Sequence, residues 1–268
     1  MKDLHSRFGF HTTPFTREIS TDCRFSLPLL DEPVDALERV IERRMSAALI
    51  APAGTGKTSI LRALNARLPE ARYRVRYIKV TCLARRDMCR EIASATGCAP
   101  AGNFPALVRR LQEHLLQVAD TDGLRPILLI DEAHETRPEV MGLFRLLTNF
   151  AMDSRLVLSL VLCGQPPLKT LLNRDDMEDV ARRMALYASL RPLTREETRQ
   201  YIEHRCSVAG APTLPFDERA CDAIFEIGRG NLRATDNLAL ESLQLAHQAD
   251  LGSVGYNHVA EARRLLWP

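Results

Sequence analysis

The stretch Leu49–Leu64, "LIAPAGTGKTSILRAL", decides the fold, because an apolar run breaks into a short glycine-containing loop and then resumes with helical spacing. The loop has P-loop spacing, with Ala51 in the place of the first glycine. Gly54 and Gly56 let backbone N–H groups approach a phosphate closely, and the helix that begins near Lys57 adds the positive end of its dipole. We therefore expect this loop to bind a nucleoside triphosphate.

The side chains that follow the glycines predict how the nucleotide is held. Lys57 can reach the β- and γ-phosphates, and the hydroxyl of Thr58 can ligate Mg²⁺. A flexible loop with a chance Gly-Lys-Thr is the alternative, but a strand before it and a helix after it favour the P-loop. The nucleotide-binding residues expected here are Ala53, Gly54, Thr55, Gly56, Lys57, Thr58 and Ser59.

A second motif, "ILLIDEAH" at residues 127–134, ends an apolar strand in two acids. We expect Asp131 to hold Mg²⁺, directly or through water, and Glu132 to polarise the attacking water. A strand that simply ends in solvated acids is the alternative reading of the motif. A glutamate at this place, together with the P-loop, indicates an ATPase that hydrolyses its nucleotide.

Composition sets wider limits. The chain has 268 residues, of which 46% are apolar and 26% charged, and a net charge of +2, as in ordinary soluble proteins. Whole-protein charge does not indicate a nucleic-acid partner, although arginines cluster locally. Seven cysteines without a CxxC pair predict reduced thiols and no zinc site. Without a signal peptide or a long apolar run, we expect a cytoplasmic protein with no membrane partner.

The chain pattern predicts an α/β fold. Apolar strands alternate with helices as far as Pro192, which favours a parallel sheet covered on both faces. After Pro192 the pattern is helical, and Thr194 and Glu197 have capping-box spacing. The expected parts are an irregular N-terminal arm (residues 1–30), an α/β ATPase domain (31–191) and a helical lid domain (192–268).

The chain resembles the AAA+ ATPases, and more narrowly the ExeA-like group, over nearly its whole length. The segments that carry the resemblance are "FGFHTTPF", "APAGTGKTSILRAL", "ILLIDEAH", "LVLCGQPPLKTLL", "DVARRMALYASLRPLTREETRQYIEHR" and "GRGNLRATDNLALESL", in the expected order. The resemblance implies a three-layer αβα P-loop domain with a small helical lid, and ATP with Mg²⁺ as cofactors. The group includes secretion-assembly ATPases and the helper ATPases of Mu-type phages and bacterial transposons.

The resemblance also implies further site residues. Gln165 resembles the sensor 1 residue that reads the γ-phosphate, and Arg233 resembles the sensor 2 arginine, although Leu232 stands where the family usually has proline. Arg182 and Arg183 resemble the position of an arginine finger that acts on a neighbouring subunit, with Arg174 a weaker candidate. A finger in trans implies a homo-oligomer, either a ring or a helical filament. Solvated turn or helix-end residues are the alternative for each of these positions.

Two groups of residues outside the motifs have competing interpretations. The arm residues Phe8, Phe10, Pro14 and Phe15 could pack near the adenine or simply in a core. Arg85 and Arg86, on a loop after the second strand, and Arg90, one turn on, could bind DNA phosphates or form a solvated face. Arg74, Arg76 and Lys79 are weaker candidates, because their strand could be interior.

Three functions follow from the resemblance. The favoured one is an ATP-dependent regulator of DNA transposition that assembles on duplex DNA, recruits or activates a transposase, and disassembles on hydrolysis. The second is an ExeA-like secretion-assembly ATPase. Such chains usually continue into a membrane span and a cell-wall-binding domain, whereas this sequence ends at "RRLLWP". The third is a nucleotide-switch signalling or scaffold protein that hydrolyses ATP slowly or not at all. Glu132 and the candidate finger arginines argue against it, because they indicate hydrolysis.

Overall fold

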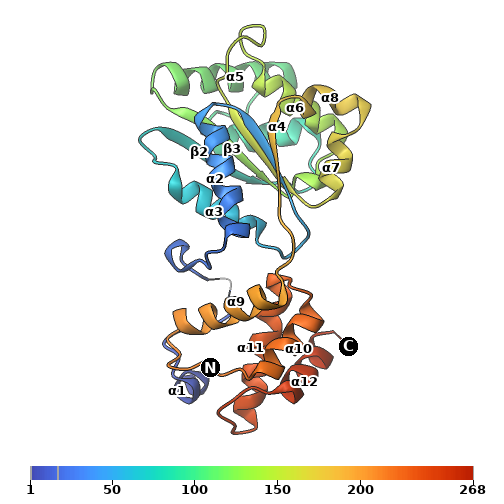
Figure 1. Ribbon diagram of the computed structural model, residues 1–268. Helices are drawn as coiled ribbons and strands as arrows, with labels where there is room; N and C mark the ends of the chain where they lie inside the picture. The colour runs from blue at the N-terminus through green and yellow to red at the C-terminus, as the bar shows by residue number, and fades with distance from the viewer. Residues whose placement is uncertain (1, 17, 268) are drawn as a thin grey trace. The chain divides into compact units, whose positions relative to one another are not determined.

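The computed structural model describes residues 2–16 and 18–267. The chain forms two compact units (Figure 1). The first comprises Met1–Leu27, Ala53–Gly56 and Arg191–Pro268, and the second comprises Pro28–Pro52 and Lys57–Leu190. The domain boundaries expected from the sequence stay a prediction.

The second unit is built on a five-stranded sheet, in the order β2-β3-β4-β1-β5, in which every neighbouring pair is parallel. This confirms the predicted parallel sheet. Because the strands are parallel, their carboxyl ends meet at one edge of the sheet, where α/β folds place their ligand sites. The strands are β1 (Ser46–Ile50), β2 (Tyr73–Lys79), β3 (Arg125–Asp131), β4 (Ser159–Gly164) and β5 (Met184–Ser189).

Helices cover both faces of this sheet. Leu128 and Ile130 of β3 belong to one apolar core with Met88 and Leu107 of the helices α4 and α5. The alternate residues of β3 are also buried, so they face the other side, where α2 packs on β1, β5 and α3. The helices of this unit are α2 (Pro28–Glu42), α3 (Lys57–Arg67), α4 (Arg85–Thr96), α5 (Phe104–Asp120), η2 (Ala133–Glu135), α6 (Pro138–Thr148), α7 (Pro167–Leu172), η3 (Asp175–Met177) and α8 (Glu178–Ala181).

The first unit is helical and includes part of the N-terminal arm. The arm is not wholly irregular as predicted, because Leu4 and Phe8 lie one turn apart and bury the same face of a short helix in the core of this unit. Phe10 and Phe15 join that core too, so core packing is the role that the structure shows for these aromatics. The helices are α1 (Lys2–Phe8), η1 (Thr21–Cys23), α9 (Arg195–Val208), α10 (Glu218–Gly228), α11 (Leu232–Gln248) and α12 (Tyr256–Leu266).

Two further expectations can be compared with the structure. All seven cysteines are free thiols, as the composition predicts. Across residues 2–16 and 18–267, none of the helices combines the length and the apolar character that crossing a bilayer requires.

Helix α9 begins with the capping box that the sequence predicts. The side chain of Thr194 accepts from the backbone N–H of Glu197, and the carboxylate of Glu197 accepts from the backbone N–H of Thr194 at 2.7 Å. Arg191 donates two hydrogen bonds to the same carboxylate, at 2.7 and 2.8 Å. These contacts, led by the one with Arg191, lower the pKa of Glu197 from 4.5 to about 2.

Replacing Glu197 by Ala should destabilise the protein by about 1 kcal/mol near neutral pH, the usual size of a lost cap with an exposed ion pair. Because the folded-state pKa lies below the ordinary one, the stabilisation is complete above 4.5 and is lost as the pH falls toward about 2. Denaturant unfolding at several pH values, with the exposed neighbour Glu196→Ala as control, measures this. A loss that stays the same at acid pH would contradict the assignment.

Candidate nucleotide-binding site

Lys57 lies where the phosphate-binding loop becomes helix α3. Its side chain is buried, and its ammonium donates to the carbonyl oxygens of Ala51 and Pro52, at 3.0 and 2.9 Å. The loop leaves β1 beside the end of β4, since the backbone N–H of Ala51 donates to the carbonyl of Gly164. The ammonium thus lies at the carboxyl edge of the sheet, within hydrogen-bond distance of two carbonyl groups of the loop.

The four residues before Lys57 belong to the first unit. Gly54 and Gly56 have φ of +75° and +99°, a conformation that glycine adopts without steric cost. Within the first unit, the side-chain amide of Asn231 donates to the carbonyl of Ala53 at 2.6 Å, and the backbone N–H of Arg233 donates to that of Gly54 at 3.2 Å. Arg233 is the second residue of α11, and its side chain is exposed.

Asp131, the last residue of β3, is the centre of the acidic part of the site. It is 2% exposed. Its Oδ2 accepts from the Thr58 hydroxyl at 3.1 Å, and its Oδ1 accepts from the backbone N–H of Glu132 at 2.9 Å. The loop threonine and the strand-end aspartate, 73 positions apart in the chain, are therefore in direct contact, as a shared magnesium site requires.

Glu132 adopts a backbone conformation that a non-glycine residue takes only where its surroundings enforce it. Its φ is +54°, in the left-handed region, at the turn from β3 into η2. The Oε2 atom of Glu132 is buried and has no hydrogen-bond donor among the described residues. A buried carboxylate oxygen without a donor needs a partner, and a water molecule that it could deprotonate fits that need.

His134 connects this turn to the end of the neighbouring strand. The backbone N–H of Gln165 donates to Nδ1 of His134 at 3.3 Å, so Nδ1 is the acceptor and the proton lies on Nε2, which faces Glu135 at 3.3 Å. Nδ1 lies 3.6 Å from Glu132 Oε2 and offers it no hydrogen. At Gly164, an added Cβ would lie 3.0 Å from the backbone nitrogen of His134, so glycine permits this close approach.

These groups fit ATP and Mg²⁺. Lys57 would bind phosphate oxygens, Thr58 and Asp131 would hold the metal, and both metal-binding side chains supply the oxygen atoms that Mg²⁺ prefers. When bound, Mg²⁺ neutralises phosphate charge. The orphaned oxygen of Glu132 would take a proton from the attacking water. Gln165 directly follows β4, the strand next to β3, and its backbone N–H donates to His134 in the turn that contains Glu132.

The candidate finger arginines are not part of this cluster. Arg183 donates to both carboxylate oxygens of Asp153, at 2.7 and 3.0 Å, and its side chain is 19% exposed. Arg182 makes an exposed helical pair with Glu178 at 2.5 Å and is 75% exposed. Arg174 donates two hydrogen bonds to the carboxylate of Asp176, at 2.9 and 3.0 Å. A role in trans does not require any of them to contact the site of its own chain.

The candidate DNA-binding arginines lie on helix α4. Arg85 and Arg86 were expected on a loop, but α4 begins at Arg85, whose guanidinium lies over the ring of Phe104, 4.4 Å from its centroid. Arg86 donates to the carbonyl of Gly102 at 3.2 Å, and Arg90 lies 3.6 Å from Asp87. Arg85 and Arg86 are both exposed.

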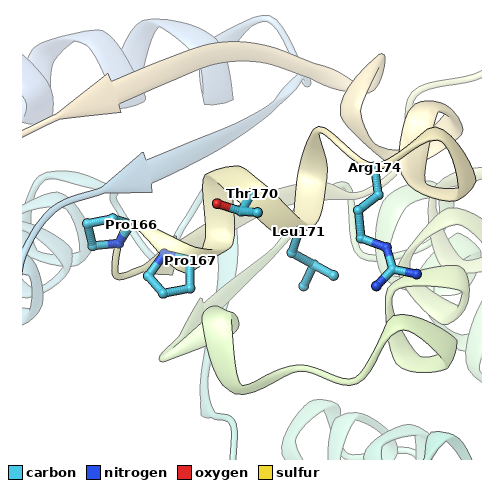
Figure 2. Close-up of a pocket in the computed structure, with 5 residues that line it drawn as sticks. All are labelled: Pro166, Pro167, Thr170, Leu171 and Arg174. Carbon is cyan, nitrogen blue, oxygen red and sulfur yellow. The ribbon is translucent and has the colours of Figure 1, made fainter.

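A hollow of about 490 Å³ lies beside α7 and is lined by Pro166, Pro167, Thr170, Leu171 and Arg174 (Figure 2). These residues follow Gln165 directly, but they include neither the loop lysine nor the acids of β3. The residues that line the hollow are thus close to Gln165 in the sequence, but the hollow is not the phosphate site.

Two residues of the cluster were not predicted. His134 stands in the quoted "ILLIDEAH", but only its acids carried an expected role. Tyr77 donates its hydroxyl to Asp131 from β2, at 2.9 Å. No motif spacing identifies Tyr77. The alternating pattern of its strand shows only that its side chain points to the opposite face of the sheet from those of Arg76 and Ile78.

The fold and this cluster define an ATPase of the P-loop class. Residues 40–172 match the family model described as the AAA domain. This region is thus similar to the AAA domain of P-loop ATPases, a family that uses ATP and Mg²⁺ as cofactors.

One curated protein is similar to this chain in sequence. Over 179 residues, the chain is 30% identical to General secretion pathway protein A of Aeromonas hydrophila; the match covers 66% of this chain and 32% of that protein. The chain thus spans about a third of the length of this relative.

The solved structures that are similar share the fold. Cdc6p from Pyrobaculum aerophilum matches with a TM-score of 0.75 and 18% identity, covering 93% of this chain and 69% of that one. The Aeropyrum pernix ORC1 protein, solved in complex with DNA, matches with a TM-score of 0.70, 20% identity and coverages of 91% and 67%. The Thermotoga maritima RuvB branch migration motor matches with a TM-score of 0.63, 18% identity and coverages of 94% and 73%. These similarities confirm the predicted AAA+ fold.

Proposed function

We propose that this protein is an ATP-dependent DNA-binding regulator of transposition. In this proposal it assembles on duplex DNA in the ATP-bound state and recruits or activates a transposase, and hydrolysis then ends the assembly. The single observation that supports it best is the junction of Thr58, Asp131 and the orphaned Glu132 oxygen, since a site equipped to hydrolyse ATP provides a timed release. DNA as the partner is supported by analogy with the ORC1 structure, which contains DNA.

The proposed DNA contacts are Arg85, Arg86 and Arg90 on α4. Arg85 and Arg86 are exposed in the first helical turn, and Ala84 before them provides no side-chain cap, so the helix N–H groups there also face solvent or a ligand. Arginines and helix N-termini both bind phosphates without reading bases. This favours DNA binding that does not depend on sequence.

Replacing both Arg85 and Arg86 by Ala should weaken binding to every duplex sequence alike and lower the slope of log affinity against log salt by about 2, since each phosphate contact contributes about 0.9. Fluorescence anisotropy on two unrelated duplexes, over a salt series with a hydrolysis-resistant ATP analogue, measures this. The matched control is Arg263→Ala with Arg264→Ala, another exposed pair on a helix. An unchanged slope would place the DNA contacts elsewhere.

Oligomerisation, as a ring or a helical filament, belongs to the same proposal. Arg182 and Arg183 are its candidate fingers, and the ion pairs of the two differ. Arg183 is held by Asp153 and largely covered, whereas the exposed pair of Arg182 with Glu178 contributes little energy. Arg182 can therefore turn toward a neighbouring subunit at lower cost, and we favour it as the finger.

The second candidate is a secretion-assembly ATPase, and a specific observation favours it. The relative that is 30% identical is a general secretion pathway protein. This relative supports secretion as much as the ORC1 structure supports DNA binding, so the comparisons together do not make secretion the weaker candidate. Duplex DNA distinguishes them: ATP-dependent binding to DNA supports transposition, and its absence favours secretion.

A further inference from the structure

Tyr77 reaches the proposed magnesium site from the edge of the sheet. It belongs to β2, which pairs with β3 and forms one edge of the five-stranded sheet. Tyr77 is 49% exposed, and yet its hydroxyl donates to Oδ2 of the buried Asp131 at 2.9 Å. A half-exposed side chain fills little of a core, so packing alone does not account for this placement.

The carboxylate of Asp131 is held from three directions. Its Oδ2 accepts from Tyr77 and from Thr58, and its Oδ1 accepts from the backbone N–H of Glu132. These donors come from β2, α3 and the turn after β3, so the plane of the carboxylate is fixed by three separate elements.

Of the three donors, only Tyr77 has no other proposed role. Thr58 is expected to ligate Mg²⁺, and the N–H of Glu132 is part of the backbone that sets the catalytic turn. Groups that orient a metal ligand from behind typically change metal affinity or activity by roughly 10- to 100-fold when they are removed.

We propose that Tyr77 is a positioning residue that orients the Asp131 carboxylate for Mg²⁺. The inference rests on the proposed role of Asp131 at the metal and is independent of DNA, transposase or secretion. It adds to the site a side chain from the edge strand, which neither the P-loop nor the acidic motif contains.

The test is Tyr77→Phe, which removes only the hydroxyl. The matched control is Tyr187→Phe on β5, the opposite edge strand, where the residue is 44% exposed and its hydroxyl donates to the backbone carbonyl of Ala181. Binding of a fluorescent, hydrolysis-resistant ATP analogue is followed while Mg²⁺ is titrated. Tyr77→Phe should need roughly 10-fold more Mg²⁺ for half-maximal binding, with binding in EDTA unchanged, whereas Tyr187→Phe should match the wild type.

A second measurement separates positioning from a general structural effect. In an Asp131→Asn background, Tyr77→Phe should have no further effect on the Mg²⁺ requirement, because its partner no longer binds the metal. A Mg²⁺ requirement of Tyr77→Phe that equals that of the wild type would overturn the inference and leave the proposed function standing. A wild-type protein whose nucleotide binding ignores Mg²⁺ would instead overturn the role of Asp131, and the inference with it.

Discussion

Replacing Glu132 by Gln should reduce ATP turnover by roughly 100-fold or more and leave ATP binding nearly unchanged. The amide is nearly the same size as the carboxylate, but it cannot take a proton from water, and a positioned general base contributes roughly 100- to 10,000-fold. The orphaned Oε2 of Glu132 is the atom that this substitution changes. In steady-state assays, the loss should therefore fall on kcat.

The chain offers a close control for this variant. Glu135 lies in the same turn, faces the same histidine at 3.3 Å and is half-exposed. Glu135→Gln should keep turnover within a few-fold of the wild type, because the half-exposed carboxylate of Glu135 can hydrogen-bond to His134 and to solvent. If both variants lost turnover equally, the turn would matter only as a structure; if Glu132→Gln kept full turnover, another group would be the base.

Replacing Lys57 by Ala should abolish the stabilisation of the protein by ATP. At an ATP concentration 100 times the wild-type Kd, bound ATP stabilises the folded state by about 2.7 kcal/mol; a variant that binds 100-fold more weakly gains only about 0.4 kcal/mol. Lys57 is placed for so large an effect, because its buried ammonium lies in the phosphate-binding loop, and a hydrogen bond from an ammonium to a charged phosphate oxygen is a strong one.

Thermal unfolding with and without ATP and Mg²⁺ measures this directly. Lys169→Ala, on the exposed face of α7, is the control and should respond to ATP like the wild type. Without nucleotide, Lys57→Ala should melt near the wild-type temperature. An undiminished response of Lys57→Ala to ATP would show that the phosphates bind somewhere other than this loop.

The local motifs could be predicted from the sequence, because each of them depends on residues that lie within a few positions of one another. The change from apolar alternation to helical spacing around Gly54 and Lys57 predicts β1 and α3 closely, and the run before Asp131 predicts β3. The capping box at Thr194 and Glu197 is of the same kind, since its partners lie three residues apart.

The features that were missed depend on contacts between distant segments. Tyr77 reaches Asp131 only because β2 pairs with β3, and nothing in the sequence near Tyr77 states that pairing. The helix in the arm was missed because Leu4 and Phe8 gain their stability from the core of the first unit, not from a long periodic pattern. The ring of Phe104, 19 positions further along the chain, lies under the Arg85 guanidinium, and the sequence near Arg85 does not indicate that contact either.

In the proposed function, ATP holds the protein on DNA and hydrolysis by Glu132 releases it. The most direct test follows the protein bound to a labelled duplex over time after a limited amount of ATP is added, by anisotropy or electron microscopy. The wild type should assemble and then leave the DNA as ATP is consumed, whereas Glu132→Gln should assemble to the same extent and remain. Equal binding with ATP, with ADP and without nucleotide would contradict the account.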